Sequence, residues 1–312
     1  MQTVVKLPPA PLETSVPRSR GRTLAMALGL GVLVTYAWSF TLVDSVIGDN
    51  IANSLLGFDA KETAITGGLM GAMFAFVSGL AGTFTACNIA AFSAIAPLME
   101  QERSFASKAA AVARPIGWLA LGMVAVAGTY GAIGAAVGPG IPQLSEGAVG
   151  TYPIRLLQST VVFGAIGLIL LYMGLAALRI VPDPLARLYA RHPRAQLVIM
   201  GALIGGFLIG RPFPLFFKMF SYAASTGNAA YGGLVFILQA AGNILVMLAL
   251  FLLLAYGTRG GFQRWLEAVP GRVQRFTAAA LIVAGSFTFL YWVVRVPAIF
   301  GYGWWPVAPW NA

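Results

Sequence analysis

Cysteine and histidine each occur only once in the 312 residues, as Cys87 and His192. A single cysteine excludes a disulfide within the chain and any dithiol centre that the chain could form by itself. One histidine with one distant cysteine falls short of the ligand number of an ordinary metal site, so we predict no metal. The sequence also has no phosphate-binding loop, no Ser/His/Asp set and no paired carboxylates at usable positions, which excludes the enzyme classes that depend on them.

Charged residues are scarce as well. They make up 10% of the chain, whereas a soluble domain has about a quarter, and 58% of the residues are hydrophobic. This composition predicts an all-α polytopic membrane protein. A helix needs roughly 20 apolar residues to cross the hydrocarbon core. Seven stretches are long enough to be transmembrane helices: 23–43, 64–98, 115–137, 156–178, 197–222, 229–256 and 277–296.

The basic residues, which give a net charge of +10, are concentrated in every second connection between these stretches. They lie before the first span, between the second and third, between the fourth and fifth, and between the sixth and seventh. By the positive-inside rule, the amino terminus is cytoplasmic and the carboxyl terminus lies outside. We therefore predict a multi-pass protein of the cytoplasmic membrane that contacts membrane lipid and binds no nucleic acid.

The spans divide the chain into a tail, an extra helix and two halves. Residues 1–22 are expected to form a disordered cytoplasmic tail. Residues 23–43 are expected to be a retained helix, because their apolar run is longer than that of a cleaved secretory signal. Residues 64–178 and 197–296 hold three spans each, and residues 297–312 form an outer aromatic tail. Three is odd, so the halves cross the membrane in opposite senses, which predicts a 3+3 inverted repeat.

Two of the apolar stretches are interrupted, the second at residues 83–88 and the fifth at residues 210–214. An interrupted helix releases N–H and C=O groups that find no water in lipid, so it persists only where protein or a cavity accommodates it. One interruption in each half of a membrane protein indicates a binding site between them, near the middle of the bilayer. The sequence thus predicts two broken helices that meet at the working site.

The residues around both interruptions resemble the CcdA/DsbD family of transmembrane thiol-reductant conduits. Residues 74–98 are similar to a family helix in which a glycine-rich run leads to a Ser-Pro-Cys-like break and a later proline. Cys87 matches that cysteine and Pro97 that proline. Gly-Arg-Pro-Phe-Pro at 210–214, followed by Ala-Ala-Ser-Thr-Gly-Asn at 223–228, is similar to the family's Thr-Pro-Cys-x-x-Pro-like turn and Ala-Ser-x-Gly loop.

This resemblance implies transfer of thiol reducing equivalents across the membrane in cytochrome c or thiol maturation. Cys87 would be the reactive thiol, and the partner would be a thioredoxin-like or cytochrome-maturation protein. The chain departs from the family at Ala86, where the family has proline, and at Phe213, where it has its second cysteine. The internal disulfide through which the family passes two electrons cannot form here. Either Cys87 works with a cysteine of another chain, or the dithiol chemistry has been lost.

Arg211 lies within the fifth stretch, where an arginine costs at least about 2.5 kcal/mol on insertion scales and marks a functional site by default. No acidic residue occurs within a span. The expected partner of Arg211 is therefore an anionic ligand, a quinone carbonyl, a lipid headgroup or the carboxylate of another membrane subunit. The structural alternative is a hydrogen bond to carbonyl groups released by Pro212 and Pro214. The predicted binding residues are Thr85, Asn88, Arg211, Pro212, Phe213, Pro214, Lys218, Gln239 and Asn243.

Other candidates have structural alternatives too. A free cysteine such as Cys87 is often a small buried hydrophobe, and the hydroxyl of Thr85 can bond back to its own helix. Gln239 and Asn243 are one turn apart and could line a cavity with Arg211 or tie two helices together. The sequence leaves three functions open: a thiol-reductant conduit, a small-solute transporter or ligand-binding protein, and a non-catalytic scaffold subunit of a membrane complex.

Overall fold

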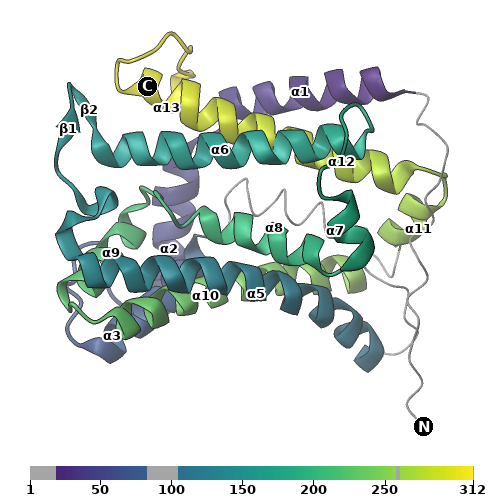
Figure 1. The fold of residues 1–312 in the computed structure, drawn as a ribbon. Helices are drawn as coiled ribbons and strands as arrows, with labels where there is room; N and C mark the ends of the chain where they lie inside the picture. The colour runs from purple at the N-terminus through teal and green to yellow at the C-terminus, as the bar shows by residue number, and fades with distance from the viewer. Residues whose placement is uncertain (1–18, 83–104, 258–260, 312) are drawn as a thin grey trace.

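The computed structural model describes residues 19–82, 105–257 and 261–311, and most of them are helical (Figure 1). The only strands among these residues form one short hairpin, β1 (Ala148–Val149) with β2 (Tyr152–Pro153). The longer helical segments are α1 (Arg20–Ala37), η1 (Thr41–Gly48), α2 (Asp49–Leu56), α3 (Gly68–Ala81), α5 (Phe105–Val137), α6 (Ile154–Ala177), α8 (Ala195–Gly206), α9 (Pro214–Ser225), α10 (Ala229–Gly257) and α12 (Arg272–Phe289). The shorter ones are η3 (Gly138–Gly140), η4 (Pro142–Leu144), α7 (Ala186–Arg191), α11 (Gly261–Glu267), η5 (Leu290–Arg295), α13 (Val296–Ile299) and η6 (Pro309–Asn311).

The fold is that of a helical membrane protein. Four stretches are long and apolar enough to cross a bilayer, namely Arg114–Gly140, Ile154–Ala177, Ala229–Val246 and Arg272–Ile299. A fifth is reached if α1 and the η1–α2 segment, which are bent by 71°, count as one span. The prediction of a single helix over residues 23–43 is therefore corrected: the observed helix is α1. It ends at Ala37, because the chain turns there into η1 and α2, which run across the direction of the long helices (Figure 1).

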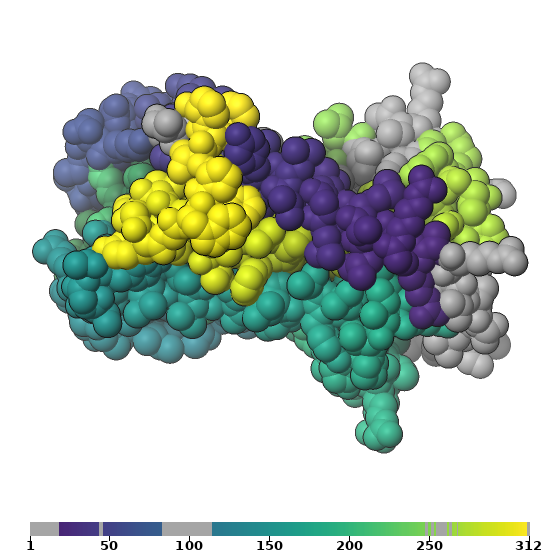
Figure 2. Space-filling view, turned by 90° about the horizontal axis from the view of Figure 1, so that it is seen from above, coloured from purple at the N-terminus to yellow at the C-terminus, as the bar shows by residue number. Residues whose placement is uncertain are grey.

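The helices form two groups (Figure 1). One group contains α3, α5, α8, α9 and α10, and the other contains α1, α6 and α12. The groups meet where α6 contacts α8. In the second group, α1 and the carboxyl-terminal residues cover α12 from outside, beside α6 (Figure 2). Large apolar side chains on α1 point outward, among them Leu33 with 59% of its surface exposed, as is expected of a face turned to lipid.

Two helix pairs approach through glycines that face each other. In the antiparallel pair α5 and α10, a Cβ atom on Gly131 would lie 2.5 Å from the carbonyl oxygen of Gly232. In the antiparallel pair α6 and α12, a Cβ atom on Gly285 would lie 2.7 Å from the carbonyl oxygen of Gly167. Glycine leaves room for backbones to touch, and contact between backbones is a main source of helix association in lipid.

Two further helix pairs run parallel, and they too approach closely at glycines. A Cβ atom on Gly79 of α3 would lie 2.1 Å from the carbonyl oxygen of Gln239 of α10. A Cβ atom on Gly201 of α8 would lie 1.8 Å from the carbonyl oxygen of Leu119 of α5. The first helix of each half is thus packed along the middle helix of the other half.

Basic residues gather at the end of the molecule that carries α7 and α11, which we call the basic end (right in Figure 1). The opposite end, with β1 and β2, is the hairpin end. The arginines that lie in or near the helix ends at the basic end are residues 20, 22, 179, 187, 191, 194, 264, 272 and 275. The short helix α11 (Gly261–Glu267) also lies at this end.

Candidate functional site

The fifth apolar stretch is broken where the sequence predicts. Helix α8 ends at Gly206, and α9 begins at Pro214, whose missing N–H is no loss at the first helical position. Residues 207–213 between them are not part of either helix. Gly210 has φ +96°, a left-handed conformation that disfavours other residues. The predicted interruption at 210–214 is confirmed, except that Pro214 already belongs to the second half-helix.

Residues from outside the fifth stretch satisfy the polar backbone groups at this break. Gln143, which is buried in η4, accepts a hydrogen bond from the N–H of Gly210 at 2.8 Å and donates one to the carbonyl oxygen of Arg211 at 2.7 Å. The hydroxyl of Tyr130 donates to the same Gln143 side chain at 2.6 Å. The hydroxyl of Ser159 on α6 donates to the carbonyl oxygen of Gly210. The broken backbone is thus held by α5, η4 and α6, because unpaired groups would be costly there.

Sequence reasoning missed these supporting residues. Gln143 lies in a connection between spans, where a polar residue is ordinary and carries no signal. Tyr130 and Ser159 lie in apolar stretches, in which isolated hydroxyl residues are common. Only the three-dimensional position of Gly210 reveals their role.

The side chain of Arg211 reaches from this break to the end of α3. It is buried, with 8% of its surface exposed, and its Nη2 donates to the carbonyl oxygen of Gly82 at 2.7 Å. Its guanidinium carbon also lies over the ring of Phe213, at 5.3 Å from the ring centre. Gly82 directly follows α3 and is the last described residue before the predicted first interruption. Arg211 therefore joins the second break to the point at which the first one is expected to begin.

Residues Thr85, Cys87 and Asn88 lie outside the described residues. So does the whole predicted interruption at 83–88. Their predicted roles remain predictions. The described residue nearest to them in the sequence is Gly82, whose added Cβ would lie 2.5 Å from the Arg211 guanidinium, so a larger residue at this position would require the guanidinium to move.

A cavity of about 340 Å³ lies beside the break, and we call it the aromatic cavity. Arg211, Pro212, Phe213 and Pro214 form one wall, and Asn243 of α10 contributes to the lining as well. The cavity thus brings together five of the predicted binding residues. The remaining wall comes from the ends of α1 and α6, from α8, and from α12 to α13.

Gln239 is not among the described residues that line this cavity. Its side chain is fully buried near the crossing of α3 and α10, and neither amide atom has a hydrogen-bond partner. The hydroxyl of Ser78, also buried, has no partner either. The expectation that Gln239 and Asn243 face one cavity therefore holds for Asn243 alone.

A second cavity, of about 370 Å³, lies on the side of the break toward the hairpin end, and we call it the hairpin-side cavity. Its lining includes Arg155 at the start of α6 and again Arg211, together with the break prolines Pro212 and Pro214. Arg155 lies over the ring of Phe217 at 5.0 Å. The described lining of both cavities contains no acidic residue.

Lys218 is engaged elsewhere. Its Nζ donates to the carbonyl oxygens of Ala60, at 2.8 Å, and of Lys61. It lines neither cavity among the described residues. These contacts give Lys218 a role in fixing the loop between α2 and α3 against α9, which the sequence did not suggest.

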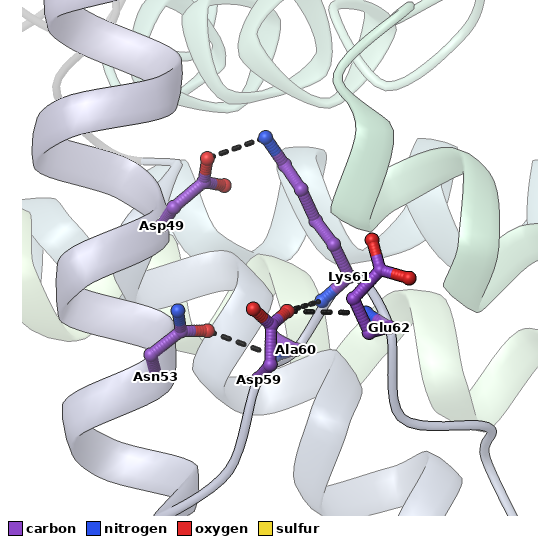
Figure 3. Close-up of polar contacts among 6 residues, drawn as sticks. All are labelled: Asp49, Asn53, Asp59, Ala60, Lys61 and Glu62. Carbon is purple, nitrogen blue, oxygen red and sulfur yellow. Dashed lines mark hydrogen bonds and ion pairs between the residues drawn. The ribbon is translucent and has the colours of Figure 1, made fainter.

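The same loop is held from its other side by α2 (Figure 3). Lys61 forms an ion pair with Asp49 at 2.5 Å, and the side chain of Asn53 accepts a hydrogen bond from the N–H of Ala60 at 2.8 Å. Asp59 accepts hydrogen bonds from the N–H groups of the two residues after Ala60. The polar cluster at the hairpin end is therefore a set of loop contacts that secures the start of α3.

Arg295 is the second buried arginine, with 1% of its surface exposed. It donates to the carbonyl oxygens of Thr35 and of Trp38, the latter at 2.6 Å. These carbonyls belong to the last turn of α1 and its cap, where backbone acceptors lack helical partners. Arg295 thus has a structural task, in fastening the end of α1 to η5.

Comparison with protein-family models, with curated proteins and with solved structures found no match. The site is therefore interpreted from its own chemistry. It offers a cationic side chain, an amide and many aromatic rings at a backbone break inside a membrane protein. Such a site can bind a small molecule that carries an anionic or carbonyl oxygen on an apolar body.

Proposed function

We propose that the chain is a seven-span protein of the cytoplasmic membrane, with one extra helix followed by an inverted 3+3 repeat. The helix contacts support this proposal. In such a repeat, a two-fold axis in the membrane plane would exchange the pair α3 with α10 for the pair α8 with α5. It would map the antiparallel pairs α5 with α10 and α6 with α12 onto themselves, and the helices of all four pairs are in contact. The basic end would face the cytoplasm.

On this architecture we propose the function that the CcdA/DsbD resemblance implies, transfer of thiol reducing equivalents through Cys87. The observation that carries it is the hydrogen bond from Arg211 to Gly82. This bond brings the second break, with Phe213 at the position of the family's second cysteine, to the segment that leads into Cys87. The partner is of the thioredoxin-like or cytochrome-maturation type.

The chemistry requires thiols from other chains, because this chain has one cysteine. The Cys87 thiolate attacks a disulfide of an oxidised partner, forms a mixed disulfide with one partner sulfur and releases the other as a thiol. A thiolate of a reduced dithiol protein then attacks Cys87 in that mixed disulfide, so that the first partner leaves fully reduced. The donor closes its own disulfide and releases Cys87 as a thiol. Two electrons pass from donor to acceptor.

Trapping of the mixed disulfide tests this function. Cells that make the protein are quenched with acid, free thiols are blocked with a maleimide, and the protein is examined on a non-reducing gel. We expect a species of higher mass that disappears on reduction and is absent from the Cys87→Ser variant. We also expect the variant to lower the amount of covalently assembled cytochrome c.

The control lies within the chain, because any mixed disulfide must use its only cysteine. Thiol transfer is contradicted if no such species forms in the native protein and if Cys87→Ser leaves cytochrome c and the thiol state of periplasmic proteins unchanged. That outcome would favour a second candidate, transport of a small anionic solute. Transport of an anionic solute is supported by the hairpin-side cavity, whose described lining has Arg155 and Arg211 and no acidic residue.

A further inference from the structure

The aromatic cavity has features that thiol transfer does not use. Its walls include a stack of rings from α6, from η5 and from the first residue after α8. Phe163 of α6 lies between Trp292 of η5, with ring centres 4.3 Å apart and planes at 29°, and Phe207, with ring centres 5.4 Å apart and planes at 26°. All three residues line the cavity. Flat rings favour offset stacking on such surfaces, so the walls suit a planar, conjugated ligand.

The cavity also contains a hydrogen-bond donor without a described partner. Thr288 of α12 lines it with 1% of its surface exposed, and its hydroxyl makes no hydrogen bond with any described residue. A buried polar group that is left unsatisfied points to a group missing from the site. The described lining has no carboxylate, so the missing group is expected to bring acceptor oxygens rather than a positive charge.

The rim of the cavity is apolar and exposed. Phe40, Ile299 and Phe300 belong to its lining and are among the large hydrophobic residues with more than a third of their surface exposed. In a membrane protein, such a rim faces the lipid. A ligand would therefore reach the cavity from the bilayer, and it must be soluble there.

We propose that the aromatic cavity binds a lipid-soluble quinone, whose ring packs beside the stack of aromatic rings and whose carbonyl oxygen accepts a hydrogen bond from Thr288. The volume of about 340 Å³ lies within the range of small-molecule sites. An acyl chain would fill the same space, but it would gain nothing from the stacked rings and would leave the hydroxyl of Thr288 unpaired.

The test uses 2,3-dimethyl-1,4-naphthoquinone, whose substituted ring does not alkylate thiols. Its binding to the purified protein in lipid nanodiscs is measured by equilibrium dialysis against empty nanodiscs. Two other probes are 2,3-dimethylnaphthalene, which lacks the carbonyl oxygens, and decanoic acid. We expect saturable binding of one quinone per protein, with the hydrocarbon bound at least about tenfold more weakly because it accepts no hydrogen bond.

Two matched variants locate the interaction. Thr288→Val keeps the shape of the side chain and removes the hydroxyl, so it should weaken quinone binding about fivefold and leave hydrocarbon binding unchanged. Thr35→Val is the control, because the hydroxyl of Thr35 is buried but bonded to the carbonyl oxygen of Gly31. Thr35→Val should change neither quinone binding nor hydrocarbon binding. The proposal is overturned if binding of the quinone does not saturate. It is also overturned if the quinone and the hydrocarbon bind with equal affinity and Thr288→Val has no effect on either. A third contradicting result is that decanoic acid binds as tightly as the quinone and loses the same affinity in Thr288→Val.

Discussion

Replacement of Gln143 by leucine is expected to destabilise the protein by about 3–5 kcal/mol. The buried Gln143 side chain pairs with the N–H of Gly210, the carbonyl oxygen of Arg211 and the hydroxyl of Tyr130. Leucine fills similar space but leaves two backbone groups of the break without partners. Each orphaned group costs about 1–3 kcal/mol. The measurement is the free energy of unfolding by sodium dodecyl sulfate in mixed micelles.

Gln158→Leu is the matched control for this experiment. Gln158 donates one hydrogen bond, to the hydroxyl of Tyr130 at 3.1 Å, and its side-chain oxygen has no partner. Its loss orphans no backbone group, so we expect a cost of about 1 kcal/mol. Equal effects of the two substitutions would mean that Gln143 does not hold the break.

The second large effect is expected for Gly201→Ala. The new Cβ would lie 1.8 Å from the carbonyl oxygen of Leu119 and 3.0 Å from its Cα, so α8 must move away from α5. A backbone atom cannot rotate aside as a side chain can. We expect a loss of about 3 kcal/mol or more, at or above the upper end of ordinary overpacking, measured by the same unfolding titration.

Gly117→Ala is the control in the same pair of helices. A Cβ atom on Gly117 of α5 would meet nothing within 4 Å. Alanine should therefore keep or raise the stability by up to about 1 kcal/mol, because it favours a helix more than glycine does. If Gly201→Ala proves as harmless as Gly117→Ala, α8 and α5 do not pack as closely as described.

The sequence predicted the class of fold and the second break because both depend on local chemistry. Apolar length identifies a membrane helix wherever it lies. Gly210 and Pro214 interrupt a helix through their own backbone preferences, whatever surrounds them. Arg211 was conspicuous because a buried arginine is rare in a span. These signals require no knowledge of which helices touch.

Other features depend on tertiary contacts and could not be predicted. Gln143 is polar and lies between spans, so its burial follows only from the position of Gly210. Lys218 was among the predicted binding residues, but its ammonium group donates to backbone carbonyls of the loop before α3. The bend after Ala37 was not predicted either; it leads into η1, whose end lies close to Phe213, since a Cβ atom on Gly48 would lie 3.2 Å from that ring.

The central claim is that the two breaks meet inside the membrane, with Cys87 opposite Phe213. Introducing a second thiol by Phe213→Cys tests it most directly. Phe213 is buried beside Arg211, at the position that the proposed resemblance assigns to the second cysteine. A disulfide forms only when two Cα atoms come within about 4.4–6.8 Å. Phe217→Cys, one turn farther along α9, is the control.

Both variants are oxidised in membranes with copper phenanthroline, denatured, and labelled with a maleimide polymer that counts free thiols on a gel. For Phe213→Cys we expect no free thiol until the protein is reduced, and two afterwards. For Phe217→Cys we expect two free thiols throughout. Two free thiols in oxidised Phe213→Cys, with a folded protein, would contradict the meeting of the two breaks.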